Sequence, residues 1–148
     1  QIPKRFRRTE NVRRRGVHIR RGDYISSPAA NVFRCIPFSY YEKAFAALPP
    51  SDEVFIFSDD EKIAAELSES LSGINISAQC LSAVEEFSVL SSCDDFIIAN
   101  STFSWWAAKI GRVSTSTVIA PANWYHDASR NSANTLLEMP AIDFTLTD

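Results

Sequence analysis

Short apolar segments alternate along this chain with segments whose apolar residues recur at helical spacing, and this alternation constrains the fold more than any other feature. The apolar segments have the length of strands, and they are apolar throughout rather than at every second residue. Strands of that kind lie in a parallel sheet covered by helices on both faces, with right-handed crossovers. We therefore predict an α/β, Rossmann-like parallel sheet of about five strands. The predicted strands are residues 17–20, 54–57, 74–78, 96–99 and 117–120, and the predicted helices are 39–48, 61–71, 82–92 and 105–110.

Three Ser-x-x-Glu patterns mark expected helix starts. In such a capping box, the serine and glutamate side chains each satisfy a backbone N–H that the helix leaves unpaired. The patterns are Ser39 with Glu42, Ser58 with Glu61, and Ser82 with Glu85. Gly73 and Gly111 follow the second and fourth helices and are expected to end them. Residues 123–148 have no clear period and are expected to form a loop and a short terminal segment.

The length of 148 residues fits one domain with a full core, and 45% hydrophobic with 22% charged residues is ordinary for a folded protein. No apolar run reaches the ~18 residues of a membrane span, and the start lacks the layout of a signal peptide. Cys35, Cys80 and Cys93 are odd in number and have no metal-like spacing, which favours free thiols in a reducing compartment. A first residue other than Met is typical of a cut or incomplete chain.

The charge of the chain is unevenly distributed. Residues 1–23 hold nine Lys or Arg against two acidic residues, a balance of +7, and the other 125 residues hold six basic and sixteen acidic residues, or -10. A basic arm for nucleic acid is one interpretation, but Phe6 is the only aromatic residue in the basic run before the first strand, and nucleic-acid binding is not favoured. The other interpretations are a connector from a preceding domain and a helix end near an anionic ligand.

Four clusters of polar residues follow predicted strands directly. They are residues 18–24, 58–60, 100–104 and 121–125. The carboxyl ends of parallel strands share one edge of a sheet, and ligands bind at that edge. Polar clusters at strand ends therefore predict a ligand site there.

Two of these clusters carry the chemistry of an anion site. Arg20 and Arg21 follow the first strand, and arginine presents a planar fork of donors that matches phosphate. Residues 100–104 combine small hydroxyl side chains with a helix start, whose free N–H groups and positive dipole end attract anions. Both clusters also have ordinary explanations, since arginine pairs are common on surfaces and serine or threonine commonly caps a helix without a ligand.

The order and spacing of these motifs resemble glycosyltransferase family 11, the α-1,2-fucosyltransferases that use GDP-fucose. The matching segments are VHIRRGDY at residues 17–24, FSDD at 57–60, IIANSTFSWWAA at 97–108, and VIAP at 118–121 with Trp124 and Tyr125. The resemblance covers about residues 16–127.

This resemblance implies a two-lobed, GT-B-type enzyme whose carboxyl-terminal lobe binds the sugar nucleotide. Residues 16–148 are expected to be that GDP-fucose-binding lobe, and residues 1–15 a basic connector or the remnant of a missing amino-terminal lobe. The expected reaction is inverting transfer of fucose from GDP-fucose to a terminal galactose hydroxyl of a glycan acceptor. The alternative is a catalytically incomplete GDP-sugar-binding module without its acceptor lobe. The expected location is cytoplasmic or membrane-associated in a bacterium, or the Golgi membrane in a eukaryote.

The resemblance also implies roles for the two anion-binding clusters. Arg20 is expected to stabilise the negative charge that grows on the β-phosphate as GDP leaves, with Arg21 contributing either to phosphate charge balance or to the geometry of the motif. The helix start is expected to hold the same diphosphate from the opposite side. The substrate-binding residues there are Asn100, Ser101, Thr102, Phe103 and Ser104. Two arginines and a helix terminus can replace a metal ion, so neither a metal nor another cofactor is expected.

The remaining candidates each have two open roles. Asp23 is either the base that receives the acceptor proton or, as we favour, a salt-bridge partner that orients an arginine. His18 either bonds to phosphate or ribose or packs in the core. Asp59 and Asp60 either accept from ribose hydroxyls and guanine N–H groups or serve as helix-start carboxylates. The alternative guanine contacts are Asp94 and Asp95.

Overall fold

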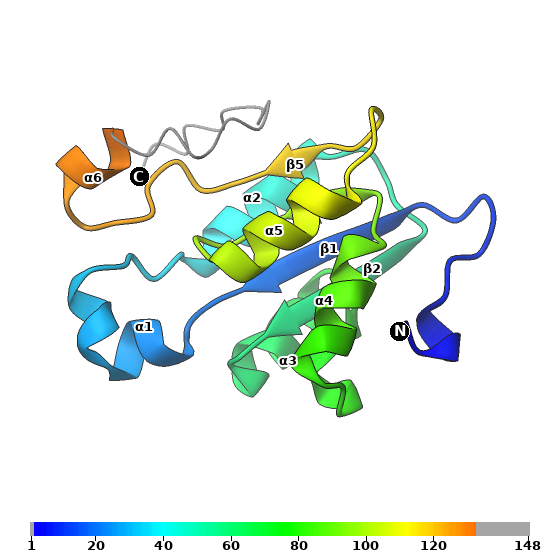
Figure 1. The fold of residues 1–148 in the computed structure, drawn as a ribbon, viewed down its shortest axis with the longest axis horizontal. Coiled ribbons are helices and arrows are strands. Elements are labelled where there is room, and N and C mark those ends of the chain that lie inside the picture. The colour runs from blue at the N-terminus through cyan, green and yellow to red at the C-terminus, as the bar shows by residue number, and fades with distance from the viewer. Residues whose placement is uncertain (1, 133–148) are drawn as a thin grey trace.

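A five-stranded parallel sheet forms the middle layer of the structure, a computed structural model that describes residues 2–132 (Figure 1). The strand order is β3-β2-β1-β4-β5, and every neighbouring pair is parallel. The predicted Rossmann-like α/β class and the approximate number of strands are therefore confirmed. The strands are β1 (Arg14–Ile19), β2 (Glu53–Ser58), β3 (Ile74–Asn75), β4 (Asp95–Ile97) and β5 (Val118–Ile119).

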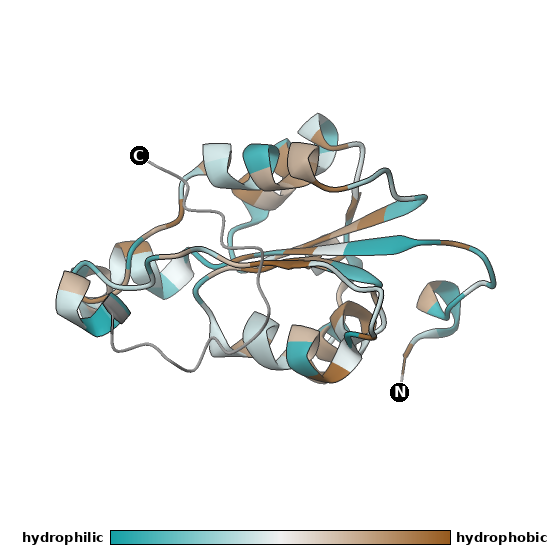
Figure 2. Cartoon of the chain, turned by 90° about the horizontal axis from the view of Figure 1, so that it is seen from above, coloured by the Kyte–Doolittle hydropathy of each residue, from teal (hydrophilic) through white to brown (hydrophobic). Residues whose placement is uncertain are grey.

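Helices cover both faces of this sheet, as Figure 2 shows with the sheet edge-on. One face carries α2 (Phe38–Ala47) and α3 (Glu61–Ser70), and the other carries α4 (Ala83–Ser91) and α5 (Thr102–Gly111). Two five-residue helices lie in the connections beyond the carboxyl ends of β1 and β5. They are α1 (Gly22–Ser26) and α6 (Ala128–Ser132). Three short 3-10 turns complete the described elements, at Lys4–Phe6, Pro28–Asn31 and Ser77–Gln79.

Successive residues of β1 pack into two different cores because side chains alternate across a sheet. Val17 and Ile19 are fully buried in the core beneath α2 and α3. Gly16 lies on the opposite face, where an added Cβ would be 2.4 Å from Leu90 Cδ1 of α4. The glycine therefore lets α4 approach the central strand closely.

Two of the three predicted capping boxes are not formed at the helix starts. Only the box at the start of α4 is confirmed, with Ser82 and Glu85 bonding reciprocally. Helix α2 begins earlier, because Pro37 is its extended N-cap residue and Ser39 lies inside the helix. Helix α3 is capped by Asp60, whose side chain accepts from the N–H of Ile63 at 3.2 Å.

Other boundaries also moved. Strand β1 begins three residues before its predicted start, β3 is shorter than predicted, α5 begins three residues early, and α1 was not predicted at all. Gly73 does not end α3 by adopting a left-handed conformation, since Ser72 holds that conformation with φ 51. Gly73 is instead required by space, because a Cβ there would lie 2.9 Å from Ile56 Cγ1. The predicted terminal segment after residue 132 lies outside the described residues.

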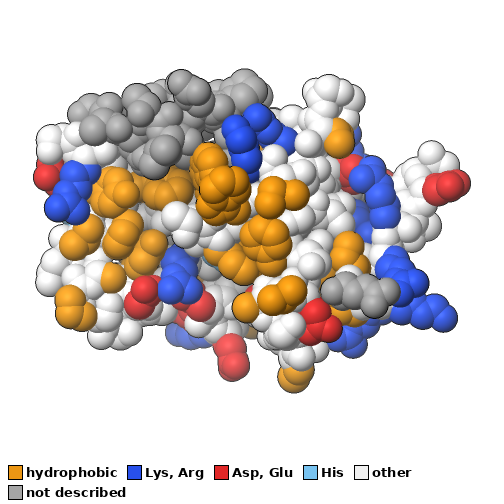
Figure 3. Space-filling model, viewed as in Figure 1, with side chains coloured by type: hydrophobic (Ala, Val, Ile, Leu, Met, Phe, Trp, Pro, Cys, Tyr) orange, Lys and Arg blue, Asp and Glu red, His pale blue; other side chains and the backbone are white. Residues whose placement is uncertain are grey.

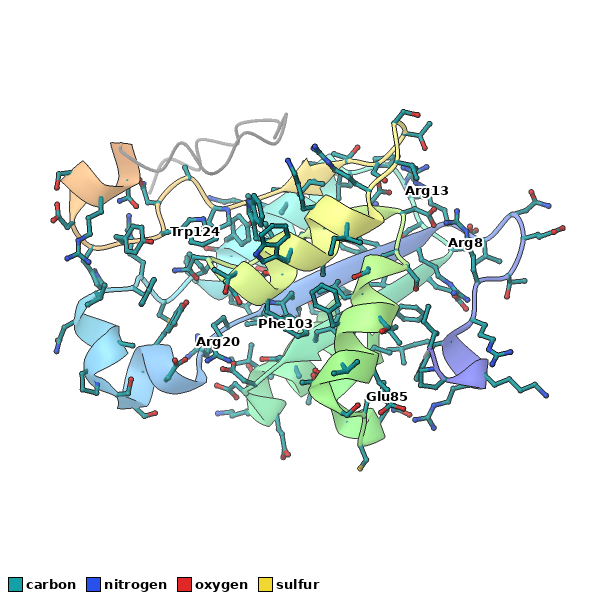
Figure 4. All side chains as sticks on the ribbon, in the orientation of Figure 1. Arg8, Arg13, Arg20, Glu85, Phe103 and Trp124 are labelled. Atoms are coloured by element: carbon teal, nitrogen blue, oxygen red, sulfur yellow. The ribbon has the colours of Figure 1, made fainter. Side chains whose placement is uncertain are left out.

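The amino-terminal arginines pair with acidic residues at the amino edge of the sheet. Arg13 forms a bidentate pair with Asp95, both contacts at 2.7 Å, and this bond raises the pKa of the guanidinium. Arg14 pairs with Glu53 at 2.6 Å, and Arg8 pairs with Asp94. Figure 4 shows Arg8 and Arg13 at the end of the sheet opposite Arg20. In the described residues the basic run forms a 3-10 turn at Lys4–Phe6, a connecting segment and the start of β1, and not the end of an α-helix.

None of the helices in residues 2–132 is long and apolar enough to cross a bilayer. All three cysteines occur in this described part as free thiols, with Cys93 buried, Cys35 half-buried and Cys80 exposed.

Candidate functional site

The carboxyl edge of the sheet brings together the two clusters that the sequence marks as anion-binding. Strands β1 and β4 are neighbours, and the chain leaves them in opposite directions, toward β2 on one side and β5 on the other. Ligands of doubly wound sheets bind in the crevice at such a reversal. Residues 18–24 and 100–104 both lie at this point.

Two direct contacts join the clusters. The imidazole of His18 stacks on the ring of Phe103, with centroids 5.2 Å apart and planes at 29°. The hydroxyl of Tyr24 donates to the carbonyl oxygen of Asn100 at 2.9 Å. Figure 4 shows Arg20 and Phe103 close together at the end of β1. The residues on either side of the crevice are thus held in fixed register.

Arg20 is held by two carboxylates and remains partly accessible. Its Nη2 lies 2.8 Å from Asp23 Oδ1 and its Nη1 lies 3.0 Å from Asp59 Oδ2. The guanidinium also lies over the ring of Tyr24, 5.8 Å from its centroid. The Arg20 side chain is 36% exposed, so part of the guanidinium stays accessible to another group. Figure 3 shows basic, acidic and hydrophobic side chains gathered in this region.

Arg21 turns to a different part of the site. Its Nε lies 3.3 Å from Asp60 Oδ2 at the start of α3. Arg20 instead pairs with Asp23 and Asp59, so the two adjacent arginines have different acidic partners.

His18 is a buried and neutral group. The pKa of its imidazole is lowered from 6.5 to about 4, mainly by burial; the negative charge of Asp59 partly offsets this lowering, and the positive charge of Arg20 adds to it. Among the described residues Nδ1 has no hydrogen-bond partner. His18 thus packs against α5, as one of its two predicted roles requires, and also keeps a nitrogen that a ligand or water can reach only after local rearrangement.

Asp60 is a helix-start carboxylate, as one of its two predicted roles requires, whereas Asp59 does not cap the helix that follows it. Asp60 caps α3, the helix that follows it. Asp59 instead accepts from the backbone N–H groups of Arg21 and Gly22 at the start of α1, at 2.8 and 3.1 Å.

The segment from residue 100 to 104 divides into structural and free groups. Asn100 is fully buried, and its Nδ2 donates to the carbonyl oxygens of Arg34 and Trp124 at 2.8 and 2.9 Å. The Ser104 hydroxyl is buried and donates to the carbonyl oxygen of Ser101 at 3.2 Å. Ser101 is the N-cap residue of α5, yet no side chain among residues 2–132 caps this helix start, and Thr102 is exposed. The N-terminus of α5 therefore keeps unpaired backbone donors at the crevice.

The alternative guanine contacts are wrong for this site. Asp94 and Asp95 lie at the amino end of β4, where they bind Arg8, Arg13 and the N–H of Arg14. A carboxylate committed to arginine at the opposite edge cannot also bind a ligand at the carboxyl edge.

A stack of three aromatic rings next to Arg20 was missed from the sequence. Tyr24 and Phe33 stack at 4.7 Å with planes at 5°, and Phe33 meets Tyr125 at 5.2 Å. Tyr24 and Tyr125 stand in the matching motifs, so their presence was visible, but no pattern marked Phe33. The stack ties α1 to the segment after β5.

The positive charges of this site are offset by the negative charges beside them. Arg20 and Arg21 face Asp23, Asp59 and Asp60, a formal charge of two positive against three negative. In the part of the chain that the structure describes, no three His, Cys, Asp or Glu side chains are arranged to hold a metal ion. The arrangement can therefore accept an anion through directed N–H donors rather than through net positive charge.

Comparison with known proteins gives a consistent assignment. The model of the family described as glycosyl transferase family 11 matches residues 7–139. The O-antigen biosynthesis glycosyltransferase WbnK of Escherichia coli is 36% identical over 123 residues, which cover 78% of this chain and 40% of the relative. An alpha-1,2-colitosyltransferase of Escherichia coli is 31% identical over 124 residues, which cover 78% of this chain and 42% of the relative. The chain spans about two fifths of the length of these relatives. No solved structure matches the chain significantly.

Proposed function

Because the chain belongs to glycosyl transferase family 11, we propose that it is the donor-binding part of a galactoside α-1,2-fucosyltransferase. The proposed reaction is inverting transfer of fucose from GDP-fucose to a terminal galactose hydroxyl of a glycan. Donor binding at the carboxyl edge is the part of the reaction that the described residues support.

The observation that carries the proposal is that Arg20 and the start of α5 follow the carboxyl ends of two neighbouring strands, β1 and β4. Arg20 supplies a partly exposed, charged fork of N–H donors, and α5 supplies backbone N–H groups and a positive dipole end. The His18 and Phe103 rings connect the strand that bears Arg20 to that helix. A diphosphate placed between them would accept hydrogen bonds from both sides.

This geometry suits a reaction in which GDP departs. Negative charge grows on the β-phosphate oxygen as the bond to the fucosyl carbon breaks, so donors aimed at that oxygen stabilise the transition state more than the ground state. In the proposal Arg20 provides the main charge and the N–H groups of Thr102 and Phe103 provide the opposite contacts. Neither step uses a metal ion or another cofactor.

We assign Asp23 to orientation rather than to proton transfer. Its ion pair with Arg20 at 2.8 Å supports this role. The base and the acceptor contacts then belong to surfaces beyond this site.

A second donor has specific support. One relative is named as an alpha-1,2-colitosyltransferase, so colitose is the second candidate for the transferred sugar. The alternative activity, a GDP-sugar-binding module without transfer, follows if the acceptor contacts lie outside this chain.

The test is a transfer assay with this chain, GDP-fucose or GDP-colitose, and a terminal β-galactoside. Release of GDP with formation of an α-1,2-linked product supports the enzyme, and the faster donor identifies the sugar. Donor binding with no product supports the binding module. A folded chain that binds neither donor nor GDP contradicts the proposal.

A further inference from the structure

One carboxylate, that of Asp59, makes three contacts with the turn that carries the arginines. Its Oδ1 accepts from the N–H of Arg21 at 2.8 Å, and its Oδ2 accepts from the N–H of Gly22 at 3.1 Å. The same Oδ2 lies 3.0 Å from Arg20 Nη1. Both oxygens are therefore already in use before any ligand arrives.

We propose that Asp59 is a positioning residue, which fixes the turn after β1 and the guanidinium of Arg20 so that this arginine binds the donor diphosphate. This inference rests on the proposed function and assigns Asp59 a role through Arg20 instead of a direct contact with ribose or guanine. Arg20 is the residue that touches the donor, and Asp59 sets where Arg20 lies.

Gly22 supports this role from the opposite side of the contact. An added Cβ at Gly22 would lie 2.7 Å from Asp59 Oδ2 and 3.2 Å from Asp59 Cγ. The backbone of Gly22 does not have a positive φ, so its conformation does not require glycine. The glycine is needed because a larger residue would push the carboxylate away from the turn.

The Asp59 contact also lowers the cost of binding. A long arginine side chain loses rotamer freedom when it is fixed by a ligand, and a partner that fixes it beforehand removes part of that cost. Asp59 and Asp23 contact the two terminal nitrogens of the guanidinium, Nη1 and Nη2. Arg20 is thus preorganised while it is still 36% exposed.

Whether a substitution of Asp59 weakens or strengthens ligand binding separates the positioning role from a simple charge effect. Removal of a negative charge close to an anion site strengthens anion binding when only charge matters. The positioning role predicts the opposite, because Asp59→Asn releases Arg20 and the turn. We expect Asp59→Asn to weaken binding of both GDP and inorganic diphosphate about tenfold.

Two further variants make the test specific. Gly22→Ala displaces the Asp59 carboxylate without removing it and is expected to weaken both ligands in the same way. Glu61→Gln is the matched control, since Glu61 is exposed at the first position of α3 and its loss changes the charge equally. The control is expected to bind both ligands as the wild type does or slightly more tightly.

Titration calorimetry on the wild type, Asp59→Asn, Arg20→Ala and the double variant tests whether Asp59 acts on ligand binding through Arg20. If Asp59 acts through Arg20, the double variant binds no more weakly than Arg20→Ala alone. An equal loss in the Arg20→Ala background, seen with GDP but absent with inorganic diphosphate, would mean that Asp59 contacts the nucleoside directly and overturns the inference. Unchanged or tighter binding by Asp59→Asn also overturns it.

Amide hydrogen exchange without ligand separates this inference from the proposed function. Asp59→Asn is expected to increase exchange at Arg21 and Gly22, while the capping contacts of α4 keep their protection. Unchanged exchange at Arg21 and Gly22 contradicts the positioning role. If the wild type binds neither GDP nor inorganic diphosphate, the proposed function fails, and the exchange result still decides whether Asp59 holds the turn.

Discussion

The buried imidazole of His18 makes the stability of this fold depend on pH. His18 is 8% exposed, and burial lowers its pKa from 6.5 to about 4. The unfolded chain therefore binds a proton between pH 6.5 and 4 that the folded chain does not bind. The contribution of neutral His18 to the free energy of unfolding is fully present above pH 6.5 and decreases as the pH falls toward 4.

The size of this effect follows from the two pKa values. A difference between 6.5 and about 4 corresponds to a loss of about 3 kcal/mol of unfolding free energy once the pH is below both values. Between pH 7.5 and pH 5 the same pair of pKa values gives a loss of about 2 kcal/mol. Other groups also titrate in this range, so the contribution of His18 must be isolated by substitution.

Urea denaturation of the wild type, His18→Phe and His126→Phe at pH 7.5 and pH 5 isolates it. Phenylalanine keeps an aromatic ring against Phe103 but cannot accept a proton, and His126 is an exposed histidine that serves as the control. We expect the wild type and His126→Phe to lose about 2 kcal/mol more than His18→Phe on acidification. Equal losses in all three proteins, or a His18 pKa near 6.5 by NMR in the folded protein, would refute the reasoning.

Three further predictions concern other parts of the site and the fold. Asn100→Ala should lower the free energy of unfolding by about 2 kcal/mol, because two backbone carbonyls lose a buried donor. Asn100→Asp should lower it further, because a negative oxygen would then face those carbonyls. Chemical denaturation that finds both variants as stable as the wild type contradicts this role. Gly111→Ala should lower the free energy of unfolding by about 1–3 kcal/mol, since its Cβ would lie 2.0 Å from the backbone oxygen of Ser91. Gly22→Ala should lower it by less than about 1 kcal/mol, because its Cβ would meet the end of a side chain that can move. Thermal unfolding that finds Gly22→Ala the less stable variant contradicts this prediction. Chelation of divalent metals by EDTA should leave the calorimetric Kd for GDP unchanged, since the proposed contacts are Arg20 and the start of α5. A tenfold loss of GDP affinity that added Mg²⁺ reverses would contradict these contacts.

The fold class followed from the sequence because its signal is carried by many residues at once. Apolar runs of strand length alternate with helical segments along most of the chain, so a few wrong boundaries do not change a parallel sheet with helices on both faces. Helix starts were less predictable because several local solutions compete. Ser58 and Glu61 form a formally correct capping pattern, yet Asp60 lies two residues closer to α3 and makes the cap.

The place of the site was also predictable, but its internal contacts were not. The rule that ligands bind at the carboxyl ends of parallel strands placed residues 18–24 and 100–104 together. The partner of Arg20 depends on tertiary distance, and Asp59 stands 38 residues from Arg21 in the chain. The five-residue helix α1 is too short for a periodic signal, so the turn that Asp59 holds could not be seen from the sequence.

The charge pattern shows the same limit. The basic run and the later acidic excess are visible in the sequence, but which groups meet is decided by the sheet. Because β1 lies between β2 and β4, Arg13 and Arg14 meet Asp95 and Glu53 at the amino edge. The same strand carries Arg20 to the opposite edge, where it keeps donors for a ligand.

The most direct test of the account is calorimetric titration of GDP into the wild type, Arg20→Ala and Arg112→Ala. Arg112 follows the carboxyl end of α5, far from its N-terminus, and its removal changes the charge by the same amount. We predict that Arg20→Ala weakens GDP binding about tenfold to a hundredfold, as expected for loss of a charge-assisted contact, and that Arg112→Ala binds as the wild type does. Equal affinities of Arg20→Ala and the wild type in folded proteins would contradict the central claim that Arg20 binds the donor diphosphate.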